Sequence, residues 1–265
     1  MFVTPVGRMK IASFNINGVN GRLARLLEWL EEATPDVVCL QELKIREHAF
    51  PAAALRGAGY ESIWRGQSTS FHGVAILGRG TKPIETRREL PGDSSDRQGR
   101  YIEAAIDGVL VASIYAPNGN PQPGPKFHYK LAWLERLIAH AAALYSTGAP
   151  VVLAGDFNVV PTDRDIYPTT SWDKDALLQP ASRERFRRLL AQGWTDSVRT
   201  LHPDEPMYTF WDYMRNRWSR DAGLRIDHLL LSEPLAARLM AAGVDRKVRG
   251  MAGASDHAPV WITLA

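Results

Sequence analysis

The chain has 265 residues, of which 45% are apolar and 23% are charged, and its formal net charge is +3. This composition is typical of a globular protein with a sizeable core, and it excludes an intrinsically disordered chain. The one cysteine, Cys39, excludes an internal disulfide and lies in the apolar run 37–40, which favours a buried structural thiol. No apolar run approaches the roughly 20 residues that cross a bilayer, so we expect a cytoplasmic protein with no membrane partner.

Apolar periodicity and turn residues predict ten strands and four helices. In chain order they are a strand at 10–16, a helix at 23–30, strands at 36–40, 74–77, 101–106 and 109–115, a helix at 126–145, a strand at 150–154, a helix at 182–191, strands at 207–211 and 226–231, a helix at 234–242, and strands at 244–248 and 258–264. Asp107 and Gly108 supply a hairpin turn between two of these strands, so the stretch 74–115 is predicted to be antiparallel.

The order of these elements predicts an α/β fold. Strands outnumber helices and the helices bracket groups of strands, so we expect two sheets packed face to face with helices on the outer sides. No linker or charge block divides the chain, which favours one domain at 9–265 after a short N-terminal extension at 1–8. The long loops 118–125 and 162–179 are of a kind that is often functional in a compact domain.

Polar side chains recur where predicted strands meet loops. These residues are Asn15, Asn17, Glu42, Asp156, Asn158, Asp227, His228, Asp256 and His257. Any one of them alone is explained by a turn or a loop cap, but their repeated placement favours a shared cleft on a rigid scaffold. Carboxylate and amide oxygens suit a hard cation such as Mg²⁺, and the absence of a cysteine cluster or a helical histidine pair disfavours zinc.

One segment combines cations with flat or flexible apolar side chains. It holds Arg215, Arg217, Arg220 and Arg225 together with Trp211, Tyr213, Met214 and Trp218. Such a mixture suits nucleic-acid binding, although the segment taken alone slightly favours a solvated loop with a few core aromatics.

Six short motifs occur in an order and spacing that resemble the exonuclease III and abasic-site (AP) endonuclease family. They are SFNING at 13–18, LQELK at 40–44, YAPNG at 115–119, GDFN at 155–158, LRID at 224–227 and SDH at 255–257. The resemblance covers about residues 9–265. It implies a four-layered α/β sandwich and Mg²⁺-dependent cleavage of DNA on the 5′ side of an abasic site, with 3′-phosphatase, 3′-phosphodiesterase or 3′→5′ exonuclease activity.

The resemblance also implies a catalytic and metal-binding set. Glu42 would be the principal metal carboxylate, with Asn15, Asp256, Asp156 and Asn158 completing the ligand set for Mg²⁺, or for Mn²⁺ as a substitute. Asp156 would take a proton from the attacking water, which Asn158 would position. Asp227 would orient and charge His257 for contact with a phosphate oxygen, and Tyr115 would donate its phenolic proton.

The implied substrate is double-stranded DNA with an abasic or 3′-blocked site, bound by a monomer. Asn17, Lys44, Arg100 and Asn118 would hold backbone phosphates. Phe210, Leu224 and Ile226 would form an apolar pocket that selects a flipped sugar without its base. Bacterial relatives often carry tryptophan at the position of Phe210, so the balance between exonuclease and abasic-site activity stays open.

Two other functions remain open from the sequence. The first is a phosphodiesterase or phosphatase on the same scaffold that acts on sphingomyelin or inositol phosphates, or a secreted nuclease, because fold and machinery do not fix the substrate. The second is a nucleic-acid-binding module without catalysis. The acidic residues argue against the second, since an acidic cluster would repel a polyanion that is only bound.

Overall fold

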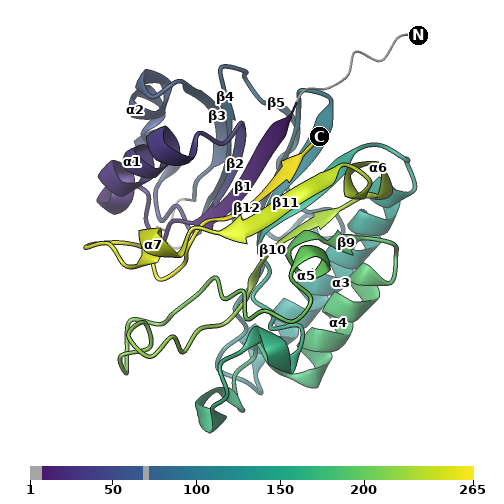
Figure 1. Cartoon of the computed structure of the whole chain (residues 1–265). Helices are drawn as coiled ribbons and strands as arrows, with labels where there is room; N and C mark the ends of the chain where they lie inside the picture. The colour runs from purple at the N-terminus through teal and green to yellow at the C-terminus, as the bar shows by residue number, and fades with distance from the viewer. Residues whose placement is uncertain (1–7, 68–71) are drawn as a thin grey trace.

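The computed structural model describes residues 8–67 and 72–265, so residues 1–7 of the expected N-terminal extension lie outside the described residues. Two six-stranded sheets pack face to face (Figure 1). In spatial order, the first sheet comprises β11 (Leu239–Val244), β12 (Val260–Leu264), β1 (Met9–Asn15), β2 (Val37–Gln41), β4 (Val74–Arg79) and β3 (Tyr60–Arg65). The second sheet comprises β5 (Ile84–Arg87), β6 (Tyr101–Ile106), β7 (Val109–Tyr115), β8 (Val151–Asp156), β10 (Asp227–Leu231) and β9 (Thr195–Asp196).

Helices cover the outer face of each sheet. The α-helices are α1 (Leu23–Ala33), α2 (Ala52–Gly57), α3 (Pro125–Tyr145), α4 (Pro180–Leu190), α5 (Ser197–Leu201), α6 (Glu233–Ala236) and α7 (Arg246–Arg249). Short 3₁₀ turns are η1 (Asn20–Arg22), η2 (Glu47–Ala49), η3 (Asp163–Asp165) and η4 (Thr170–Trp172). In the part of the chain that the structure describes, no helix is long and apolar enough to pass through a bilayer.

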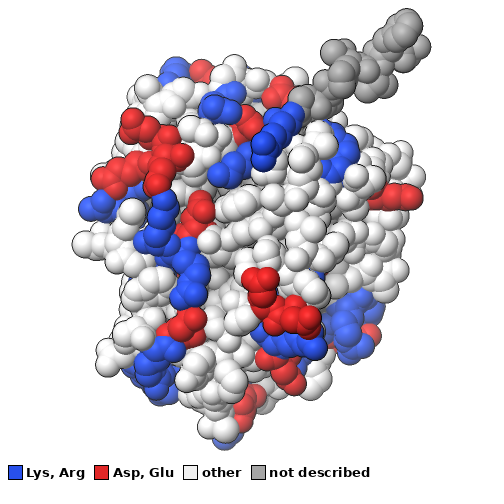
Figure 2. All heavy atoms as spheres, in the orientation of Figure 1, with Lys and Arg blue, Asp and Glu red and all other residues white. Residues whose placement is uncertain are grey.

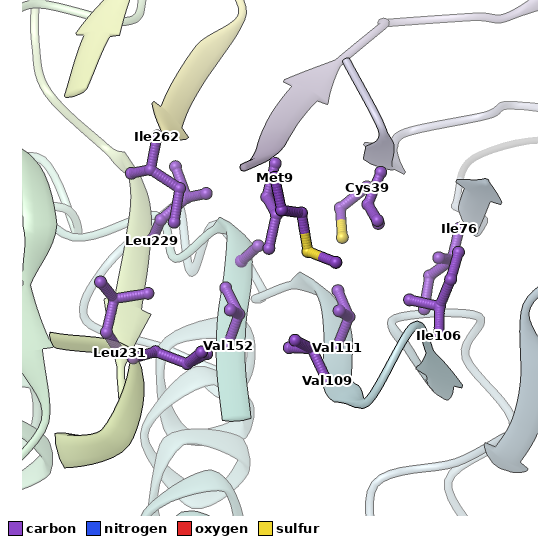
Figure 3. Packing of buried hydrophobic residues seen from close by; sticks show 14 of the residues in the cluster. Met9, Cys39, Ile76, Ile106, Val109, Val111, Val152, Leu229, Leu231 and Ile262 are labelled. Atoms are coloured by element: carbon purple, nitrogen blue, oxygen red, sulfur yellow. The ribbon is translucent and has the colours of Figure 1, made fainter. Parts of the chain in front are cut away.

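The alternation of side chains along the strands creates the layers. In β2, Val37 and Cys39 join the apolar cluster between the two sheets, whereas Val38 and Leu40 join the cluster under α1 and α2. Figure 3 shows the cluster between the sheets, with Cys39 among its aliphatic side chains. The outer face of the second sheet packs on α3 and α4 in a third cluster. The expected four-layered α/β sandwich is therefore confirmed.

Strand directions bring distant segments to one edge of the sandwich. β1 and β2 are parallel, as are β7 and β8, so all four end on the same side. β10 is antiparallel to β8, and β12 is antiparallel to β1, so these two strands begin on that side. The residues that follow β1, β2, β7 and β8 therefore meet those that precede β12 or begin β10.

The hairpin between β6 and β7 turns as predicted. Asp107 and Gly108 have φ angles of 47° and 78°, and two successive positive values match the twist of a two-residue hairpin.

Cys39 is fully buried in β2, where burial raises the pKa of its thiol above the ordinary range.

Three sequence-based element assignments are wrong. The helix expected at 234–242 ends at Ala236, and the strand expected at 244–248 is replaced by the end of β11 and by α7. The chain extends at Leu239–Val244 because it pairs with β12, and Gly243 leaves room for the ring of Trp261. Residues 207–211 form no strand and make only isolated bridges through Phe210. The strands β3, β5 and β9 and the helices α2 and α5 were not predicted from the sequence.

Candidate active site

A hollow of about 330 Å³ opens at the edge where these strand ends meet. Its wall is formed by Asn15, Glu42, Tyr115, Asn118, Asp156, Asn158, Trp172, Leu177, Phe210, Asp212, Ile226, Asp256 and His257. Every residue that the sequence analysis placed in the catalytic or metal-binding set lies on this wall except Asp227, which is buried behind His257.

Asp156 ends β8 at the base of the hollow and is almost fully buried. Its Oδ2 accepts hydrogen bonds from the side-chain amides of Asn15 (3.0 Å) and Asn158 (3.1 Å), and its Oδ1 accepts one from the Asn158 backbone N–H (2.9 Å). Burial and then the charge of Asp227 raise the pKa of Asp156 to about 7. A carboxyl group with such a pKa can accept or release a proton near neutral pH.

Asp227 and His257 form a buried pair next to Asp156. The Asp227 carboxylate lies 2.8 Å from Nδ1 of His257 and also accepts a hydrogen bond from the Thr209 hydroxyl (2.6 Å). Burial lowers the pKa of His257, but the adjacent carboxylates, Asp227 above all, outweigh burial and raise it to about 10. The other ring nitrogen, Nε2, faces Asp156 Oδ2 at 4.0 Å, so a charged imidazole N–H points into the hollow.

Glu42 and Tyr115 stand together on the wall. The Tyr115 hydroxyl donates to a Glu42 carboxylate oxygen at 2.9 Å, and the Lys44 ammonium lies 3.4 Å from the same oxygen. Burial and then the negative charge of Glu42 raise the pKa of Tyr115 well above its ordinary value, so the phenol keeps its proton. The side chain of Arg100 stacks on the Tyr115 ring at 4.8 Å and orients it from behind.

Backbone strain is concentrated in these loops. Asn17, Glu42, Lys44 and Asn158 all have positive φ angles, between 49° and 57°. Asparagine tolerates this conformation, but glutamate and lysine adopt it at an energetic cost that is typical of functional sites. The Glu42 conformation directs the loop after β2 so that the Gly18 N–H donates to the Glu42 carbonyl (2.8 Å).

The donor atoms on the wall suit a divalent cation. Asn15, Glu42, Asp156, Asn158 and Asp256 all offer oxygen atoms, the chemistry preferred by a hard ion. A tighter group consists of Asp156, Asp227 and His257, whose candidate ligand atoms lie within 4.8 Å of one another. Because Asp227 and His257 already bind each other, the oxygen-lined wall suits a metal better than this histidine-containing group.

The residues expected to bind DNA are only partly in the hollow. Asn118, Phe210 and Ile226 line it, whereas Leu224 is buried behind Phe210 in a small apolar cluster. Asn17 lies beside the wall and donates to Asp256 at 2.8 Å, and Lys44 hydrogen-bonds to Asn17.

Arg100 is 8% exposed and is held by neighbouring groups. Its Nη1 donates to the Tyr115 carbonyl at 3.2 Å, and its Nε donates to Gln98 at 2.7 Å. Arg100 therefore supports Tyr115, and because it also lines a neighbouring hollow beside Asn118, its expected contact with DNA stays a prediction.

Several residues of the site were not predicted from the sequence. Trp172 and Leu177 reach the wall from the long loop 162–179, and Asp212 follows Trp211. Lys130, on α3, is fully buried and donates to the backbone carbonyls of Asn118 and Asn158, tying two site loops together, and burial lowers its pKa to about 7. The length of the loop 162–179 is the one sequence feature that pointed towards Trp172 and Leu177, since long loops in a compact domain are often functional. No sequence feature pointed to Lys130, because its position in a predicted helix is equally typical of a solvated lysine.

Two packed sheets with a buried acid, an aspartate–histidine pair and an oxygen-lined wall at one edge define a hydrolytic enzyme with a candidate metal site. Residues 12–257 match the model of the Endonuclease/Exonuclease/phosphatase family, which is consistent with such an enzyme. The chain belongs to this family.

Curated relatives resemble the chain along nearly its whole length. DNA repair nuclease APEX1 of Danio rerio is 34% identical over 262 residues, which cover 97% of this chain and 82% of the relative. Exodeoxyribonuclease III of Haemophilus influenzae is 34% identical over 265 residues, covering 96% of this chain and 98% of the relative.

Solved structures agree with the fold. The 3′ phosphatase NExo from Neisseria, bound to a product DNA hairpin, superposes with a TM-score of 0.92 at 38% identity and covers 97% of this chain and 99% of that one. An AP endonuclease from Archaeoglobus fulgidus also gives a TM-score of 0.92, at 33% identity, with the same coverage of both chains.

Proposed function

We propose that this protein is a Mg²⁺-dependent DNA repair nuclease that hydrolyses the phosphodiester on the 5′ side of an abasic site and also removes 3′-blocking groups or 3′ nucleotides. The observation that carries the proposal is the position of Asp156 and the charged His257, which face each other across 4.0 Å at the base of a hollow, with Glu42 on its wall. The relative named a DNA repair nuclease and the similar 3′ phosphatase bound to a DNA hairpin support the choice of DNA as the substrate.

The side chains divide the work of hydrolysis. Asp156 accepts the proton of the attacking water, and the amide of Asn158 orients that water and a phosphate oxygen. His257, held and charged by Asp227, donates its Nε2–H to a phosphate oxygen as negative charge increases there. Tyr115 donates a hydrogen bond to the phosphate or to the leaving oxygen once substrate displaces its contact with Glu42.

Glu42, Asn15 and Asp256, with Asp156 and Asn158 beside them, would hold Mg²⁺, or Mn²⁺ in its place. When bound, the ion acts as a Lewis acid that neutralises charge on the phosphate and on the leaving oxygen.

Phe210 and Ile226, with Leu224 behind them, form the apolar side of the hollow. A deoxyribose without its base fits against this side, whereas a normal nucleotide must first leave its stack and then find room for the base. Asn118 and the neighbouring pair of Asn17 and Lys44 hold flanking phosphates. One chain completes the hollow, and we further propose a cytoplasmic monomer in which residues 9–265 form a single domain.

The test uses labelled duplexes that carry one tetrahydrofuran abasic analogue or one 3′-phosphate. We expect incision on the 5′ side of the analogue and loss of the 3′-phosphate, both abolished by EDTA and restored by Mg²⁺. Asp156→Asn and His257→Ala remove these activities, whereas Arg220→Gln, an exposed change, keeps them. Metal-independent cleavage, or unchanged turnover in Asp156→Asn, would contradict the proposal.

The same experiment separates the alternatives. A phosphodiesterase or phosphatase for other substrates would hydrolyse inositol phosphates or lipid head groups faster than the abasic duplex. A binding module would retain the duplex without cleaving it at any metal concentration.

A further inference from the structure

A second hollow, of about 310 Å³, lies beside the candidate active site. The two hollows share Trp172 and Asp212, so one indole forms part of both walls. The other residues that line the second hollow are Ser171 and Asp175, from the loop 162–179, and Met214, Arg215 and Arg217, from the basic and aromatic segment that follows Trp211. In Figure 1 this segment forms the loops at the lower left, below α7, and Figure 2 shows Lys and Arg side chains gathered over α7 in the same view.

Arg217 is the one arginine of this segment that is buried without an acidic partner among residues 8–67 and 72–265. It is 4% exposed, its guanidinium stacks on the Trp172 ring at 4.9 Å, and its Nη2 donates to the Ser171 hydroxyl at 2.6 Å. Its buried Nη1 finds no hydrogen-bond partner among the described residues. A buried guanidinium with an unused donor carries a desolvation cost, which an anionic ligand would offset.

The neighbouring charges do not supply that anion. Asp175 accepts hydrogen bonds from the Asn120 side chain and the Leu177 N–H, both at 2.9 Å, and Asp212 accepts one from the Met214 N–H at 2.8 Å. Neither acid forms an ion pair with Arg217 in the described structure.

Unlike Arg217, two other arginines nearby form ion pairs with acids. Arg225 is paired with Asp165 and Asp196, and Arg246 is paired with Asp221 at 2.8 Å. Burial lowers the pKa of Arg217, and the positive charges of Arg220 and Arg215 lower it further against a smaller opposing effect of Asp212, so the environment of this guanidinium favours an added negative charge.

We propose that Arg217 forms an anion subsite that binds a backbone phosphate of the DNA, next to the phosphodiester held in the active site. This inference rests on the proposed function, because it takes the neighbouring hollow to hold the cleaved linkage. A planar guanidinium with a free N–H suits a phosphate, whose oxygens accept charge-assisted hydrogen bonds. Because Arg217 stacks on Trp172, which lies edge-on to Phe210 at 6.3 Å, a bound phosphate would also fix the wall shared by the two hollows.

The first experiment measures duplex binding by the full chain in EDTA at several salt concentrations. We expect Arg217→Gln to weaken binding about tenfold and to reduce the slope of log Kd against log salt by about one, because one phosphate contact is lost. Arg217→Lys keeps the slope. The matched control is Arg220→Gln, which removes the same charge from an exposed position of the same segment outside the hollow, and its effect is expected to be under twofold.

The second experiment replaces single phosphates on either side of the abasic analogue with neutral methylphosphonates. For the wild-type chain, positions held by Asn118 or by Asn17 and Lys44 should also be sensitive, but one further position should weaken binding about tenfold, and Arg217→Gln should be insensitive at that position alone. Equal effects of Arg217→Gln and Arg220→Gln on the slope, or no position at which methylphosphonate and Arg217→Gln couple, would overturn the subsite.

Two measurements keep these outcomes distinct. Thermal unfolding by circular dichroism checks that Arg217→Gln folds. If it does not, the methylphosphonate series on the wild-type chain decides: the subsite is overturned when no sensitive position remains beyond the cleaved linkage and the positions that Asn118→Ala or Lys44→Gln make insensitive. Cleavage of the unmodified abasic duplex by the wild-type chain is measured in parallel. Cleavage without Arg217 coupling overturns only the subsite, whereas absence of cleavage overturns the proposed function.

Discussion

Arg225 is the centre of a buried ion network behind the active site, and its replacement by methionine should destabilise the fold strongly. The residue is 1% exposed and lies between Leu224 and Ile226. Its Nε donates to Asp165 at 2.7 Å, and its Nη1 donates to both carboxylate oxygens of Asp196 at 2.8 and 3.0 Å. In the sequence this arginine belongs to a segment that suits nucleic-acid binding, but its partners make it structural.

The size of the expected loss in the free energy of unfolding follows from the two acids that would lose Arg225 as their partner. Asp165 is fully buried, and although burial raises its pKa, Arg225 and Arg199 outweigh burial and lower it from 3.8 to about 2. That shift corresponds to about 2 kcal/mol of stability from one acid. Since Asp196 also loses its partner, and breaking a buried pair typically costs about 3 to 5 kcal/mol, we expect a loss in this range for Arg225→Met.

Urea unfolding at neutral pH, followed by circular dichroism, measures this loss. Arg220→Met removes an exposed arginine and should change the free energy of unfolding by less than about 0.5 kcal/mol. The stability that Asp165 contributes is complete above pH 3.8 and is lost as pH falls through about 2, so the wild-type chain should lose more stability than Arg225→Met over this acid range. A loss below about 1 kcal/mol in Arg225→Met would refute this account of the network.

Three further predictions concern single positions. Asp156→Asn should lower kcat by at least about a hundredfold while leaving the melting temperature within a few degrees, which steady-state kinetics and calorimetry would show; a variant with near wild-type kcat would remove Asp156 from the mechanism. Gly155→Ala should destabilise the protein by at least about 3 kcal/mol in urea, because the added Cβ would lie 1.9 Å from the Ile114 carbonyl oxygen in the adjacent strand, whereas Gly21→Ala meets nothing within 4 Å and should be neutral. Burial, and then Arg225, lower the pKa of His228 from 6.5 to about 4. The stability that the neutral imidazole contributes is therefore complete above pH 6.5, and about 3 kcal/mol of it is lost as pH falls from 6.5 through 4. Between these pH values the free energy of unfolding should depend less on pH in His228→Gln than in the wild-type chain, and an equal dependence would show that His228 is not the titrating group.

The sequence by itself determined the layers and the positions of most chemical groups. Period-two alternation in runs such as 37–40 dictates which side chains face the other sheet and which face a helix. The turn residues Asp107 and Gly108 specify a hairpin because their conformations are local. Short motifs at strand ends also identified Asp156 and His257 as candidates, because a polar residue at either end of an apolar run is a local signal.

Only the tertiary structure decided which of these groups meet. Asn15 and Asp156 are 141 residues apart in the chain, and their contact follows from two sheets whose strand ends share one edge. The same packing turned Leu239–Val244 into a strand, buried Lys130 under two site loops, and left Arg217 with an unused donor. Local sequence encodes periodicity, turns and caps, whereas the burial and pairing of a charge depend on atoms contributed by distant segments, so they emerge only when the sheets pack.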